Sequence, residues 1–169
     1  MDIADVTRLL PHEPPILMLD RVVDIEAGVS GVGKRLFHAD DACFRGHFPW
    51  RPVLPGVLAI EAMAQTALVV LMAEYHEQLA AGPDLPLGYL ARVEDMSFQR
   101  AIEPGQEISF EVKVEKRVSQ FTILRCRATR DAELCVKGRL AVALDRKELE
   151  AALARRLEGA PQTSREEGD

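Results

Sequence analysis

The stretch GVLAIEAMAQTALVVLMAE, residues 56–74, is the most apolar part of the chain and is long enough for a helix. Alanine, methionine, leucine and valine occupy nearly every side of such a helix, and a helix that is apolar all round is buried. Glu61 and Gln65 lie four residues apart, hence on one face, where the amide can hydrogen-bond the carboxyl group. We therefore predict a buried central helix over 56–79 that carries an oriented carboxylate.

The segment before this helix, GHFPWRPVLP at 46–55, is stiff and carries one imidazole. Its three prolines fix the backbone φ angle at three points. Between His47 and Glu61 the only charged residue is Arg51, so a base and an acid stand in an otherwise apolar setting. We predict that His47 and Glu61 are catalytic.

Alternation of apolar and polar residues predicts β-strands on both sides of the helix. The strands after it cover 108–114, 124–128 and 134–144, with turns at Pro104–Gly105 and Arg130–Asp131. Before it, a strand over 16–26 and an extended stretch over 34–38 flank a turn marked by Gly28, Gly31 and Gly33. The short connections favour antiparallel pairing, and the sheet must curl to bury the helix.

The expected fold class is therefore α+β, with a single domain over residues 1–145. A short helix is expected over 2–10, and an amphipathic C-terminal helix over 146–158. The polar tail 159–169 is expected to be disordered.

The composition is that of a soluble globular protein. The chain has 169 residues, of which 47% are hydrophobic and 28% charged, and its net charge of −6 argues against nucleic-acid binding. The longest uninterrupted apolar run, 67–73, is too short for a bilayer, and the first residues do not have the pattern of a signal peptide. We expect a cytoplasmic protein that binds neither nucleic acid nor membrane.

The three cysteines have no metal-type spacing and are odd in number, which favours free thiols over a disulfide framework or a zinc site. Cys43 lies four residues before His47, so a nucleophilic Cys–His pair is an alternative, although nearness in sequence is poor evidence for side-chain contact. His12, His38 and His76 are interpreted as structural residues. Asp20–Arg21 is interpreted as a structural ion pair or a strand-end hydrogen-bonding group.

Three blocks in fixed order resemble the FabZ type of (3R)-3-hydroxyacyl-ACP dehydratases, with the FabA type as a near relative. They are LLPHEPPILMLDRV (9–22), GHFPWRPVLPGVLAIEAMAQ (46–65) and GYLARVEDMSFQRAIEPGQEI (88–108). The resemblance implies a hotdog fold, a curved antiparallel sheet around one long helix. It also implies a homodimer whose sheets join edge to edge, alone or as a trimer of dimers.

The resemblance assigns roles to residues of these blocks. His47 is the base, and Glu61 of the other subunit is its partner. The carbonyl of Val53 holds the imidazole and Gln65 orients Glu61, while glutamate rather than aspartate at position 61 favours dehydration without isomerisation. The backbone N–H of Gly56, at the start of the helix, is suited to bind the thioester oxygen.

The expected reaction removes water from a (3R)-3-hydroxyacyl thioester on acyl carrier protein and gives the trans-2-enoyl thioester. It needs no metal or cofactor beyond the carrier's phosphopantetheine arm. An apolar tunnel would bind the acyl chain, and its candidate wall residues are Phe48, Leu54, Met63 and Phe98. An acidic carrier needs a basic patch, for which we nominate Arg51, Arg92 and Arg100; scattered solvated charges are the alternative.

Two features depart from the family pattern: Trp50 replaces the usual glycine after GHFP, and the helix at 146–158 lies beyond the usual end. A dedicated polyketide or other secondary-metabolite pathway is therefore open beside fatty-acid synthesis. Two rival functions are a hotdog acyl-thioesterase and a non-catalytic subunit that pairs with a second dehydratase-like chain.

Overall fold

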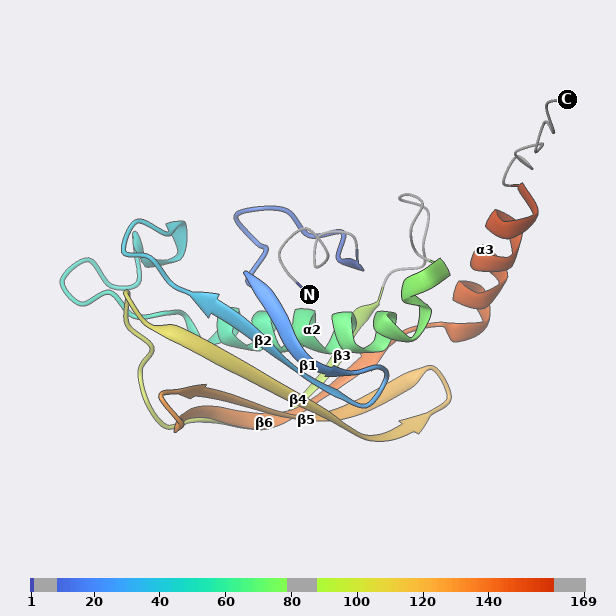
Figure 1. Ribbon diagram of the computed structural model, residues 1–169. Coiled ribbons are helices and arrows are strands. Elements are labelled where there is room, and N and C mark those ends of the chain that lie inside the picture. Colours follow the sequence, from blue (N-terminus) through green and yellow to red (C-terminus); the bar gives the residue numbers. More distant parts are fainter. Residues whose placement is uncertain (2–8, 79–87, 160–169) are drawn as a thin grey trace, which may run out of the picture.

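A computed structural model of the chain describes residues 1, 9–78 and 88–159. One six-stranded antiparallel sheet, in the order β1-β2-β4-β5-β6-β3, curls around the long helix α2 (Gly56–Met72), as Figure 1 shows. The strands are β1 (Arg21–Glu26), β2 (Ser30–Leu36), β3 (Tyr89–Phe98), β4 (Glu107–Val118), β5 (Phe121–Arg130) and β6 (Glu133–Ala143). The predicted curved antiparallel sheet around a central helix is confirmed.

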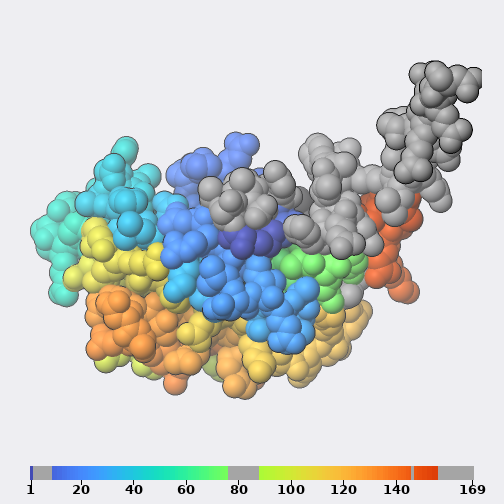
Figure 2. Space-filling model, viewed as in Figure 1, coloured from blue at the N-terminus to red at the C-terminus, as the bar shows by residue number. Residues whose placement is uncertain are grey.

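The central helix owes its apolar composition to burial against the sheet. From Ala62 to Met72 every side chain is buried except the half-buried Ala64. By length and composition Gly56–Tyr75 could cross a membrane, but 61% of its most apolar window is buried inside the protein. The uninterrupted run 67–73 is therefore shorter than the apolar stretch as a whole. Packing in the protein core explains why that stretch is apolar. In the space-filling view β1 and β2 cover the front of α2 (Figure 2).

Two glycines predicted to mark a turn lie inside β2 instead. Gly31 and Gly33 are two residues apart and face the helix, where Cβ atoms would collide with Val70 and Thr66. Only Gly28 is in the turn, with a φ of 69°. Glycine in a strand interior often marks a close approach of another element, which is the reason here.

The first strand begins later than predicted, at Arg21 rather than Ile16. The backbone groups of residues 16–18 are not free to join the sheet, because the side chain of Gln65 binds both the carbonyl of Ile16 and the N–H of Met18. A side chain from the helix thus takes the place of a neighbouring strand.

The end of the central helix and one strand differ from prediction. The helix α2 ends at Met72, and a 3₁₀ helix, η2 (Ala73–Gln78), follows it. Strand β3 was not predicted from the sequence. Its first five side chains are all exposed, so it shows no alternation of buried and exposed positions. The predicted loop 82–88, the helix over 2–10 and the tail 159–169 lie almost wholly outside the described residues.

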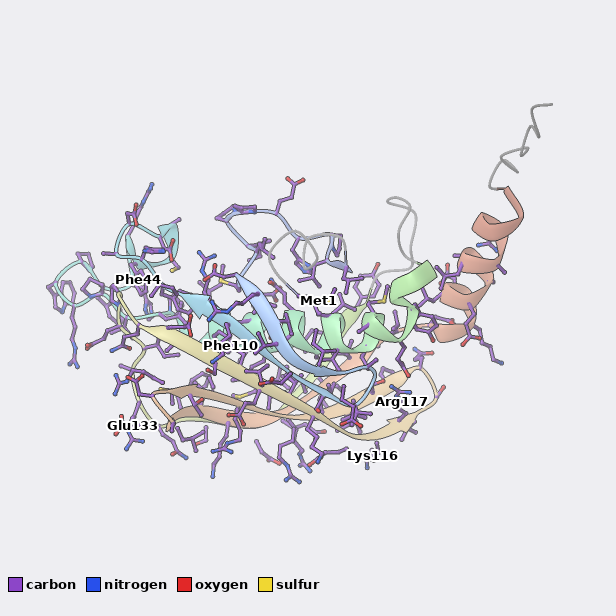
Figure 3. The ribbon with its side chains drawn as sticks, viewed as in Figure 1. Met1, Phe44, Phe110, Lys116, Arg117 and Glu133 are labelled. Carbon is purple, nitrogen blue, oxygen red and sulfur yellow. The ribbon has the colours of Figure 1, made fainter. Side chains whose placement is uncertain are left out.

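The strands that follow β3 agree with the predicted meander. β4, β5 and β6 pair in sequence, and they turn at Ser119–Gln120 and Asp131–Ala132. Figure 3 shows charged side chains projecting from the outer face of this part of the sheet. Cross-strand ion pairs such as Arg127–Glu111 lie there.

Two helical segments cover the ends of the core. The 3₁₀ helix η1 (Ala42–Phe44) inserts Phe44 edge-on against Phe37, which itself meets Phe110 of β4. Helix α3 (Arg146–Gly159) buries Leu149 and Leu153 beyond the C-terminal end of α2. The N-terminal end of α2, at the opposite side of the molecule in Figure 1, is left for the site.

Replacing Gly33 by alanine is expected to lower the free energy of unfolding by about 1–3 kcal/mol, because the new methyl group overpacks the contact between β2 and α2. Thr66 cannot turn away freely, since its hydroxyl donates to the carbonyl of Ala62 at 2.7 Å. Chemical denaturation measures the change. Gly46→Ala is the control, because a Cβ there meets no atom within 4 Å; equal losses in both variants would contradict the packing argument.

Candidate active site

The loop that carries His47 is closed by its own backbone. The N–H of Val53 donates to the carbonyl of His47 at 2.8 Å, and Phe48 and Arg51 exchange two further bonds at 3.2 and 3.1 Å. Trp50 stands at the tip and is 84% exposed. The stiffness predicted from the prolines is thus reinforced by hydrogen bonds across the loop.

The position of the His47 ring fixes which nitrogen is reactive. Nδ1 lies 2.9 Å from the carbonyl oxygen of Val53, the contact expected from the resemblance. A carbonyl can only accept, so Nδ1 carries the proton and donates it. In the neutral ring Nε2 then has the free lone pair and can act as a base.

An aromatic stack supports the same ring. Phe48 lies against His47 with centroids 4.2 Å apart and an interplanar angle of 25°. Trp50 continues the stack on Phe48 at 6.0 Å and 21°. Together with the Val53 bond, the stack restricts rotation of the imidazole.

His47 borders a cavity of about 420 Å³ at the N-terminal end of α2. The cap residue Pro55 provides no side-chain hydrogen bond, and the first turn contains no acidic residue. The N–H of Leu58 donates to the carbonyl of Pro55 at 2.9 Å, so the N–H groups of Gly56 and Val57 are the ones that could bind a ligand. Phe98 lies over Gly56, where a Cβ would come within 2.7 Å of the ring. The other lining residues are Val53, Leu54, Ala59, Gln99, Arg100, Ala101, Ile102 and Val136.

Glu61 is held by the predicted partner. The amide nitrogen of Gln65 donates to Glu61 Oε1 at 2.8 Å and to the carbonyl of Ile16 at 2.8 Å. The amide oxygen accepts the N–H of Met18, also at 2.8 Å. Gln65 is 1% exposed, so this one side chain fixes both the carboxylate and the N-terminal segment.

His47 and Glu61 occupy different cavities of one chain. Glu61 lines a small space of about 60 Å³ with His12, Ala64, Gln65, Leu68, Gly88, Tyr89, Leu90 and Val142. No residue belongs to both linings. Within one chain, His47 and Glu61 therefore face separate spaces.

The residues nominated for the acyl tunnel and carrier patch are placed unevenly. Leu54 and Phe98 line the larger cavity, whereas Met63 is fully buried in the core and Phe48 belongs to the stack. Arg100 also lines the cavity. Arg51, Arg92 and Arg100 all approach carboxylates of their own chain: Glu103, Glu94 and Glu133.

His12 was interpreted as structural, yet its Nε2 lies 3.5 Å from Glu61 Oε1. The two residues are 49 positions apart, and periodicity within the chain gives no signal for such a contact. Within the described ranges, Asp20 and Arg21 do not pair with each other: Asp20 binds Arg35 at 3.0 Å, and Arg21 binds Glu107 at 2.7 Å. Asp20 also accepts the N–H of Leu36 at 2.8 Å, which agrees with the other alternative, a hydrogen-bonding group at a strand end. The side chain of His76 lies outside the described residues.

The three cysteines are free thiols, and two of them, Cys43 and Cys126, have a raised pKa. Burial raises the pKa of Cys126 to about 12. The pKa of Cys43 is raised by desolvation and then by the charge of Asp41. A thiol with a raised pKa is a poor nucleophile at neutral pH, which argues against the Cys–His alternative.

The sequence model of the FabA-like domain matches residues 10–140. The chain belongs to the FabA-like family. Two similar curated proteins are 3-hydroxyacyl-[acyl-carrier-protein] dehydratases FabZ. The Variovorax paradoxus protein is 35% identical over 144 residues, covering 85% of this chain and 94% of its own. That of Coxiella burnetii is 36% identical over 145 residues, with coverages of 83% and 96%.

Solved structures agree on the fold. A chain of the dehydratase heterocomplex ApeI:P from Xenorhabdus doucetiae has a TM-score of 0.65 at 24% identity, covering 88% of this chain and 96% of its own. A hypothetical thioesterase with coenzyme A from Streptococcus pneumoniae has a TM-score of 0.55 at 7% identity, with coverages of 73% and 83%. The expected hotdog fold of this FabA-like chain, and its resemblance to the FabZ type, are confirmed.

Replacing Gln65 by methionine is expected to destabilise this FabA-like domain by about 1–3 kcal/mol, because the N–H of Met18 and the carbonyl of Ile16 lose their partner. Denaturation with urea measures the loss, and Gln120→Met at an exposed turn is the control. Equal stability of the two variants would contradict the stabilising role of the Gln65 hydrogen bonds.

Proposed function

We propose that this protein is a (3R)-3-hydroxyacyl-[acyl-carrier-protein] dehydratase of the FabZ type. One observation carries the proposal: an imidazole with Nδ1 committed to Val53 presents Nε2 at a cavity that also contains an uncapped helix start. A base beside a set of backbone donors suits proton abstraction next to a thioester carbonyl.

Each proposed step uses one of these groups. His47 Nε2 takes the proton from the α carbon, and the electron pair of that C–H bond forms the new double bond. The C–O bond at the β carbon breaks, and the hydroxyl leaves as water with a proton from Glu61, delivered directly or through a water molecule. The N–H of Gly56 stabilises the charge that develops on the thioester oxygen.

The complete site is proposed to form between two copies of the chain. The His47 cavity borders the Phe98 end of β3, and the Glu61 cavity borders the Tyr89 end. Among the described strands, β3 is an edge of the sheet and pairs only with β6. If β3 pairs antiparallel with β3 of a second copy, the Phe98 end of one strand meets the Tyr89 end of the other, and the two cavities come together.

The surface of β3 supports this homodimer. Tyr89, Leu90, Val93 and Phe98 are between 42% and 63% exposed, which is costly in water on an unpaired edge. On the neighbouring helix Val57 is 70% exposed, one turn before Glu61 on the same face. A second copy would cover these apolar groups; a trimer of dimers, or a dimer with a second dehydratase-like chain, would use the same edge.

The substrate is proposed to arrive on the phosphopantetheine arm of an acyl carrier protein, without any other cofactor. The apolar lining by Leu54, Phe98 and Val136 suits an acyl chain. For the acidic carrier, Arg100 is the best placed of the nominated arginines because it lines the cavity, whereas Arg51 and Arg92 are candidates outside that lining. The proposed pathway is fatty-acid, polyketide or other secondary-metabolite synthesis. The proposed location is the cytoplasm, where thiols such as the three free cysteines stay reduced.

The direct test is a mass-spectrometric assay with 3-hydroxyacyl carrier proteins of several chain lengths. The wild-type protein should form the trans-2-enoyl product, and both His47→Ala and Glu61→Gln should lower kcat about 10²–10⁴-fold, since each removes one proton-transfer group. His38→Ala, at an exposed position, is the control. Free carrier thiol without enoyl product would instead establish a thioesterase, and substantial activity of His47→Ala would refute the assignment.

A further inference from the structure

The N-terminal segment brings a second side chain to Glu61. His12 Nε2 lies 3.5 Å from Glu61 Oε1, the same oxygen that accepts the Gln65 amide. The two side chains are 26% and 27% exposed, so water reaches them only in part. This distance is long for a hydrogen bond, but such contacts often shorten when substrate binds.

The chain that follows His12 is fixed by hydrogen bonds. The N–H groups of Ile16 and Leu17 both donate to the carbonyl of Glu13 at 3.0 Å and form a tight turn directly after His12. Gln65 then ties Ile16 and Met18 to α2. The hydrogen bonds of Gln65 therefore hold His12 beside Glu61 and also orient the carboxylate.

The second ring nitrogen indicates which form of the imidazole is present. Nδ1 of His12 is buried and has no hydrogen-bond partner among the described residues. A buried N–H without an acceptor is costly, whereas an unpaired lone pair is tolerated better. A ring with its proton on Nε2 alone avoids this cost and directs the donor at Glu61.

We propose that His12 is a positioning residue for the dehydration reaction. This proposal rests on the function proposed above. Two donors, from Gln65 and His12, make Oε1 of Glu61 a pure acceptor. When the carboxyl group is protonated, its proton is confined to Oε2, the oxygen left for the departing hydroxyl. Among the described residues that line this cavity, Glu61 is the one carboxylate.

The test compares three substitutions in the full-length protein. His12→Gln keeps a donor near the place of Nε2, His12→Asn keeps one only near Nδ1, and His12→Phe keeps none. We expect His12→Phe and His12→Asn to lower kcat about tenfold to a hundredfold, as for other misplaced catalytic groups, with KM unchanged. His12→Gln should retain most of the wild-type kcat, and His38→Gln is the matched surface control.

A wild-type kcat for His12→Phe, or equal losses for the glutamine and phenylalanine variants, would overturn the proposal. The tautomer of His12, from ¹⁵N NMR of the wild-type protein at neutral pH, decides independently of activity and of the folding of any variant. A proton on Nε2 alone supports the proposal, and a proton on Nδ1 overturns it. If the wild-type protein forms no enoyl product, the dehydratase assignment fails, while the NMR result still tells whether His12 donates to Glu61.

Discussion

The amide of Gln65 sits inside an otherwise apolar helix, where a polar group without partners would be strongly destabilising. It is satisfied by the carbonyl of Ile16, the N–H of Met18 and the carboxylate of Glu61. Residues 16–18 consequently bind to α2 instead of extending β1, and the carboxylate of Glu61 is oriented by the same amide. The position of β1, the site of His12 and the orientation of the carboxylate all follow from this one buried side chain.

The helix that carries Gln65 could be predicted because its apolar composition reflects burial on nearly every side. The β4–β6 meander could be predicted because one face of each strand is buried, which produces alternation. Strand β3 could not be predicted, because most of its side chains are exposed in a single chain. In the proposed dimer a second copy would cover them. The sequence predicts Gly31 and Gly33 as turn residues, because it does not reveal that a helix passes close to them.

For the site, the local parts were predictable and the long-range ones were not. His47 and Glu61 stand out by charge in an apolar stretch, and the contact between Glu61 and Gln65 follows from helical spacing. The bond from the His47 ring to Val53 came from family resemblance and is present in the structure. His12 reaches Glu61 only through the fold, and its neighbourhood of prolines suggested a turn rather than a site. Trp50 is explained in part, as the outer member of the stack on His47.

The central claim is that His47 of one subunit works with Glu61 of another, and complementation between two inactive variants tests it most directly. Chains carrying His47→Ala and chains carrying Glu61→Gln are co-expressed in equal amounts and purified together. A heterodimer then contains one site with both catalytic residues intact, so random assembly should restore about a quarter of wild-type activity. If the mixed protein contains heterodimers and remains as inactive as either parent, the shared site is contradicted.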